Sequence, residues 1–346
     1  SGEKEFIKNQ ILTNKDYAAV YLDSVNTKIG LRIYTEQVNN KGGIGVLSET
    51  EQIQYLSACE RVMYDDIAFA IECLRNIDVR TLKTNARCRY GLIVDRMPIT
   101  EDSAALVLPL LDRLEPWSGE MMQDLVLVNL IPYQPKYVRD WLVKNVKNKV
   151  GEKRASFGVY DINLGHDIEH VYDRLKAECA KEASAAALEI VKYLCEKTAY
   201  ETQENEKIKT THMYLCYQRD QTYAHFVENI LTDLLNYYDD VAKDRTQEVV
   251  DTLGQLSHAN MDGLVLIPTS AYKANISLYK DEAFELSKRI IKDEPMSSVL
   301  KYHARELFKV LFPLLTKTQK DEIMDICRKN IAKYAMPYDI EFREKG

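Results

Sequence analysis

Apolar residues recur along this chain at the spacing of an α-helix, and a proline or a short polar break ends each recurrence. The clearest example covers residues 98–147, where apolar stripes occupy residues 98–116, 117–132 and 134–146. A helix with one apolar face cannot bury that face by itself. We therefore expect these helices to stack on their neighbours.

The same pattern extends over most of the sequence and predicts an all-α fold, either an α-solenoid or an irregular stack of helical hairpins. Ser48 and Glu51 have the spacing of a capping box, which indicates a helix start. Two Leu-Ile-Pro sequences, at residues 130–132 and 266–268, are expected to mark helix ends. No stretch reads convincingly as a strand. Further helices are predicted at residues 14–36, 48–76, 79–97, 167–200, 212–239, 241–257, 270–292, 296–315 and 318–335.

Residues 148–165 interrupt the helical period and contain three glycines, so they are the best candidate for a boundary between two helical regions. We expect an N-terminal helical-repeat region at residues 1–150 and a C-terminal helical region at residues 151–346. A glycine cluster at residues 39–45 has no strand before it and lacks the Lys-Ser/Thr ending of a nucleotide-binding loop. It predicts a loop between helices.

One stretch carries a family resemblance. Residues 106–114 read Leu-Val-Leu-Pro-Leu-Leu-Asp-Arg-Leu, and Glu115-Pro116 and a second apolar helix follow. This order resembles one HEAT-type helical repeat, in which an apolar-Pro-Leu-Leu core and a short turn lead to an antiparallel helix. The same core returns at residues 311–315 as Leu-Phe-Pro-Leu-Leu. The resemblance implies stacked helix pairs, although Glu115 and Met122 replace the family's Asp and Arg.

Composition narrows the class of protein. The net charge is −7, which gives no general attraction to nucleic acid or anionic lipid. The seven cysteines stand singly without paired spacing, a pattern typical of buried thiols in a reducing compartment. No apolar run is long enough to span a membrane. We expect a cytoplasmic protein without a cofactor. Ser1-Gly2 resembles the scar of a cleaved tag, so the chain is also compatible with a region of a larger protein.

His166-Asp-Ile-Glu169-His170 matches the H-x-x-E-H order of one class of zinc proteases. On a helix, His166 and His170 would share a face and could both bind zinc, with Glu169 as the general base. The third ligand would have to come from another helix. The alternative is a solvated first helical turn, because carboxylates favour helix N-termini.

Two aspartate pairs offer a second form of metal chemistry. They are Asp65-Asp66 and Asp239-Asp240, the latter followed by Asp244. Isoprenoid synthases, which are all-helical, hold magnesium diphosphate between two aspartate-rich motifs, and carboxylates are preferred Mg²⁺ ligands. The first pair lacks a further Asp in the next turn. Solvated helix ends are the alternative interpretation.

A basic segment at residues 136–154 carries a local charge of +5, from seven cations and two acids, with aromatic residues interleaved. Such a segment is compatible with a nucleic-acid backbone or with an acidic partner. It can also be a solvated helix face. The candidate binding residues are Lys136, Tyr137, Arg139, Trp141, Lys144, Lys147 and Lys149.

These patterns favour a non-catalytic binding or scaffold module that presents an extended helical surface to a protein or peptide, with nucleic acid as a further partner class. If the chain is part of a larger protein, the partner can be the rest of that protein. The alternative is an all-helical metal-dependent enzyme that uses residues 166–170 or the aspartate pairs. No catalytic residue is assigned.

Overall fold

A computed structural model describes most of the chain. Within the described residues there are fifteen α-helices and no strand, which confirms the all-α prediction. One isolated parallel bridge joins Lys209 and Met261. None of the described helices has the length and the apolar character that a membrane crossing requires. The described residues are 27–113, 124–152, 166–198, 208–211, 226–293 and 297–334.

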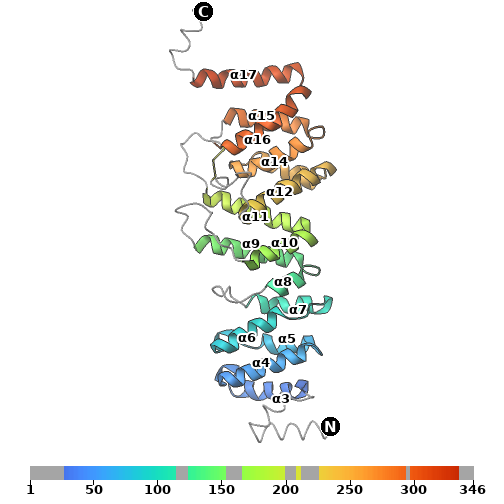
Figure 1. Ribbon diagram of the computed structural model, residues 1–346, viewed down its shortest axis with the longest axis vertical. Coiled ribbons are helices and arrows are strands. Elements are labelled where there is room, and N and C mark those ends of the chain that lie inside the picture. Colours follow the sequence, from blue (N-terminus) through green and yellow to red (C-terminus); the bar gives the residue numbers. More distant parts are fainter. Residues whose placement is uncertain are drawn as a thin grey trace, which may run out of the picture. The chain divides into compact units, whose positions relative to one another are not determined.

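The chain divides into two compact units, residues 1–145 with 165–182 and residues 146–164 with 183–346. In the first unit, α4, α6, α8 and α10 each contact the next member of that series, while α5 contacts both α4 and α7. Helices that contact their second neighbour in sequence form two rows, and Figure 1 shows α3 to α7 following one another in chain order. The helices are α3 (Thr27–Asn40), α4 (Glu49–Met63), α5 (Ile67–Arg75), α6 (Thr84–Asp95), α7 (Glu101–Leu111), α8 (Asp124–Leu130), the first part of α9 (Pro135–Glu152) and α10 (His166–Glu178).

The second unit repeats this arrangement. Helix α14 lies between α12 and α16 and contacts both, and α15 contacts α14, α16 and α17. The stacking in both units is compatible with a helical repeat. The helices are the greater part of α11 (Ala180–Thr198), α12 (Phe226–Val241), α13 (Gln247–Ser257), α14 (Asp262–Ala274), α15 (Lys280–Asp293), α16 (Ser298–Leu311) and α17 (Lys317–Tyr334).

The predicted helix starts and loops are confirmed where they depend on local chemistry. The Ser48 hydroxyl accepts a hydrogen bond from the Glu51 amide at 3.3 Å, and the Glu51 carboxylate accepts one from the Ser48 amide at 2.8 Å. Helix α3 ends before Gly42 and Gly43, whose φ angles of 104° and 91° suit glycine alone. The loop is tightly packed, because a Cβ on Gly45 would lie 2.6 Å from Cβ of Thr81.

Three long predicted helices are interrupted. The helix expected at residues 270–292 falls on the end of one helix, Asp262–Ala274, and on a second, Lys280–Asp293. The helix expected at residues 48–76 is two helices, because Asp66 leaves the helical conformation and its carboxylate caps α5 by accepting the Phe69 amide at 3.0 Å. The helix expected at residues 167–200 breaks at Cys179, between α10 and α11. Nothing in the local sequence explains the break at Cys179.

The hydrophobic pattern does not predict the greater part of helix α14, since residues 258–269 lie between two expected helices. Every residue from Asp262 to Tyr272 is buried. A helix surrounded by protein has no polar face, so it shows no helical period in its sequence. Pro268 lies inside this helix, so the expectation that residues 266–268 mark a helix end is wrong.

The two Pro-Leu-Leu sequences behind the HEAT resemblance adopt different structures. Pro109 lies inside α7, whereas Pro313 is the second residue of the short 3-10 helix η6 (Phe312–Leu314) that follows α16. The predicted boundary at residues 148–165 falls on the end of α9, which continues to Glu152, and on residues outside those described. Residues 14–26 and 212–225 of two predicted helices also lie outside them.

Candidate partner-binding surface

Helix α9 positions the basic segment. Val138 and Leu142, four residues apart, are fully buried and define the buried face of the helix. Lys136 and Lys144 lie away from this face and are exposed. Among the described residues, neither lysine has an ion-pair partner. These two ammonium groups are therefore available to another molecule.

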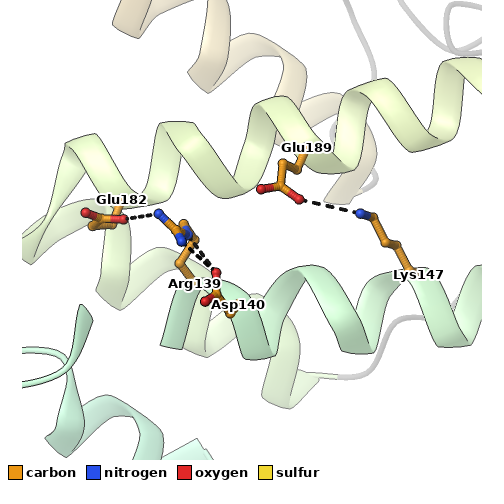
Figure 2. A network of polar contacts seen from close by, with 5 residues as sticks. All are labelled: Arg139, Asp140, Lys147, Glu182 and Glu189. Atoms are coloured by element: carbon orange, nitrogen blue, oxygen red, sulfur yellow. Dashed lines mark hydrogen bonds and ion pairs between the residues drawn. The ribbon is translucent and has the colours of Figure 1, made fainter. Parts of the chain in front are cut away.

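Other candidates in the first unit are engaged within the fold. The Arg139 guanidinium donates to Asp140 at 2.8 Å and to Glu182 of α11 at 2.9 Å (Figure 2). The Tyr137 hydroxyl donates to Asp112 at 2.9 Å, and burial raises the pKa of this phenol. Trp141 is half-buried. Arg139 and Tyr137 join secondary-structure elements that are distant in sequence.

Lys147 and Lys149 belong to the second unit. The Lys147 ammonium lies 3.5 Å from the Glu189 carboxylate (Figure 2) and 5.9 Å from the centre of the Tyr193 ring. The Tyr193 hydroxyl in turn donates to the Lys147 carbonyl at 3.2 Å. Lys149 is half-buried, and Lys153 and Arg154 lie outside the described residues. Lys147 thus has an internal partner on α11.

The H-x-x-E-H sequence begins α10. Nδ1 of His170 lies 3.1 Å from Oδ2 of Asp124, the first residue of α8, while Glu169 is exposed. His166 is helical, but its side chain is outside those described. No group of three His, Cys, Asp or Glu side chains in the described part of the chain could hold a metal ion. His170 thus contacts a carboxylate that joins α10 to α8.

The first aspartate pair performs a structural task. Asp66 caps α5 and also pairs with Lys28 of α3. The Lys28 ammonium and the Phe69 amide lower the pKa of Asp66. Asp65 is exposed. These contacts account for Asp66 without a metal ion.

The second group of aspartates does not converge. Asp239 accepts the Ser270 hydroxyl of α14 at 3.0 Å, and Asp240 pairs with Lys243 at 2.6 Å. Asp244 lies beyond the end of α12, in the 3-10 helix η5 (Ala242–Asp244), so the expected helical alignment with Asp240 is lost. Burial raises the pKa of Asp239.

Comparison with protein-family models, with curated proteins and with solved structures gives no match to this chain. The HEAT resemblance consequently depends on its two short sequences alone.

Sequence reasoning missed two buried carboxylates, Asp95 and Asp262. Asp95, near the end of α6, accepts the Leu125 amide at 3.2 Å, and burial raises its pKa to about 6. Asp262 is fully buried in the first turn of α14. An aspartate directly before the apolar run 263–267 was the only local signal for Asp262, and no local signal marks Asp95.

Proposed function

We propose that this chain is a non-catalytic recognition protein that presents a HEAT-like stack of helices to a protein or peptide partner. The observation that carries the proposal is a series of contacts between second neighbours in each unit. In the first unit α4 contacts α6, α6 contacts α8, α8 contacts α10 and α5 contacts α7, and in the second α12 contacts α14, α14 contacts α16 and α15 contacts α17. Helical-repeat proteins use such rows to build extended binding surfaces without a reaction centre.

The exposed side of α9 in the first unit is the part of this surface that we assign to the partner. Lys136 and Lys144 are separated by eight residues, about 2.2 helical turns, so their directions around the helix axis differ by about 80° and both side chains lie on its exposed side. Tyr133, 42 % exposed, lies just before α9. Two exposed ammonium groups and an exposed aromatic ring on one short segment suit a partner with acidic side chains.

A charge-reversal variant tests the assignment. In Lys136→Glu with Lys144→Glu, acidic partners should be repelled, whereas the fold should persist because neither side chain has an internal ion pair among the described residues. A matched control reverses Lys41 and Lys83, which are also exposed in the first unit. Co-purifying proteins are quantified by mass spectrometry, and circular dichroism checks the fold.

We expect proteins retained by the wild type and by the control to be lost from the α9 variant. Equal retention by all three proteins would show that α9 is not the binding surface. Elemental analysis of the purified chain provides a second check. Stoichiometric zinc that disappears on His170→Ala would contradict a non-catalytic role and favour the metal-enzyme alternative.

A further inference from the structure

The first unit contains a pocket that the sequence did not indicate. It has a volume of about 610 Å³, within the range of small-ligand sites. Its wall is formed by the segment after α5 and by the residues that follow α7. The lining residues are Arg75–Arg80, Asp112 and Arg113.

Three guanidinium groups line this pocket. Arg75 ends α5, Arg80 lies in the 3-10 helix η2 (Val79–Thr81), and Arg113 follows α7. Arg113 donates to the Arg75 carbonyl, which holds its side chain across the gap between the two helices. Among the described residues, none pairs with the guanidinium of Arg75. A planar guanidinium is suited to binding a carboxylate or phosphate through two parallel hydrogen bonds.

Two carboxylates lie beside these arginines and already accept one hydrogen bond each. Asp78 accepts the Arg80 amide at 3.1 Å, and Asp112 accepts the Tyr137 hydroxyl at 2.9 Å. The lining therefore carries three positive and two negative charges. Below them, Ile77 and Val79 are buried and supply apolar surface.

This mixture of charges decides between ligand classes. Helices α5 and α7 both end at the pocket, and a helix C-terminus carries partial negative charge. Polyphosphate sites use the opposite end, the amides of a helix N-terminus. A polyanion would meet the two helix ends and the two aspartates, whereas a peptide can place one carboxylate on the arginines and its N–H groups on the aspartates.

We propose that the pocket binds an acidic side chain, Asp or Glu, within a peptide segment of the partner protein. The inference rests on the proposed function, because it names the chemistry of the peptide that the helical surface recognises. Arg75 and Arg113 hold the carboxylate. Asp78 and Asp112 accept hydrogen bonds from the peptide on either side of it.

The test begins with peptides selected from a random library on the immobilised full chain, whose affinities are then measured by fluorescence anisotropy. We expect the selected peptides to share an acidic residue, and its replacement by Gln or Asn to weaken binding about tenfold. Arg75→Gln should cause a similar loss, and the amide peptide should lose nothing further on that variant. Arg305→Gln, an exposed arginine of α16, is the control and should bind as the wild type does.

Three results would overturn the assignment. The first is that the selected peptides contain no acidic residue. The second is that replacing the acidic residue by its amide weakens binding equally on the wild type and on Arg75→Gln, and the third is that inorganic phosphate or single-stranded RNA displaces the peptide at lower concentrations than unlabelled peptide does. If peptide binding survives Arg75→Gln but is lost on reversal of Lys136 and Lys144, only the pocket fails. The retention experiment on α9 decides the proposed function independently.

Discussion

Each unit contains a buried carboxylate that accepts a hydrogen bond from the first turn of a helix, and the two carboxylates are held differently. In the first unit, Asp95 of α6 reaches the start of a different helix, α8, and accepts the Leu125 amide. In the second, Asp262 lies in the first turn of its own helix, α14. Its Oδ1 accepts three hydrogen bonds, from the Thr211 hydroxyl at 2.7 Å, the Gly263 amide at 2.8 Å and the Thr211 amide at 3.0 Å.

The contrast separates two uses of a buried charge. Asp95 joins two helices of the same row, since α6 and α8 are in contact. Asp262 joins a helix to the non-helical segment 208–211, which also bonds to residues 260–262 through Lys209. Burial raises the pKa of both carboxylates, which means that their hydrogen bonds compensate only partly for lost hydration. Asp262, with more donors around it, should contribute more to stability.

The largest predicted effect follows from removing the Asp262 acceptor. Asp262→Ala leaves the buried amides of Thr211 and Gly263 without their side-chain acceptor, and we expect it to destabilise the second unit by about 2–4 kcal/mol. Asp262→Asn keeps an oxygen acceptor and should cost about 1 kcal/mol. Hydrogen exchange of residues 208–211, with urea unfolding monitored alongside, measures both variants. Equal effects of Ala and Asn would show that the hydrogen bonds to Oδ1 do not hold the segment.

A buried neutral group provides an intermediate case. Gln52 of α4 is fully buried; its amide donates to the Ile44 carbonyl at 3.2 Å and accepts from the Lys83 amide at 2.9 Å. Gln52→Leu should destabilise the first unit by about 1–3 kcal/mol, because both backbone groups lose their partner. The loss should be the same at pH 5 and pH 8, since no charge is involved. A loss that changes with pH would indicate that the substitution also disturbs a carboxylate.

The contribution of Asp95 to stability, unlike that of Gln52, is expected to depend on pH. Its pKa is raised from 3.8 to about 6 in the folded chain, so the folded state binds more protons than the unfolded state in that interval. Stability contributed by the neutral form is present below about pH 4 and is lost as the pH rises through about 6. Asp95→Asn stays neutral and should exceed the wild type by about 1–2 kcal/mol at pH 7, discounted for partial solvation. The two proteins should converge at pH 4. A difference that is constant between pH 4 and pH 7 would contradict the raised pKa.

The comparison also shows which features of the structure the sequence alone could predict. Capping at Ser48 depends on neighbours within one turn of the helix, so the local pattern predicted it. Most of helix α14 was not predicted because it is buried on all sides, so its apolar residues do not recur at helical spacing. Asp95 and its donor Leu125 are 30 residues apart, and Asp262 and Thr211 are 51 apart. Such pairs, like the arginine pocket, exist only after distant segments have packed.

The smallest effect is expected where the sequence directed attention first, in the basic segment. Lys147 and Glu189 form an ion pair at 3.5 Å, with side chains 37 % and 52 % exposed. A pair this exposed is screened by water and salt, so Lys147→Gln should change the free energy of unfolding by less than about 0.5 kcal/mol. Arg139→Gln removes a shorter contact to the less exposed Glu182 and should cost more, about 1 kcal/mol. Urea unfolding at low and high salt measures both. If Lys147→Gln lowers the free energy of unfolding more than Arg139→Gln does, or by an amount that does not decrease with salt, the pair is shielded from solvent. It would then resemble the buried contacts of Asp95 and Asp262.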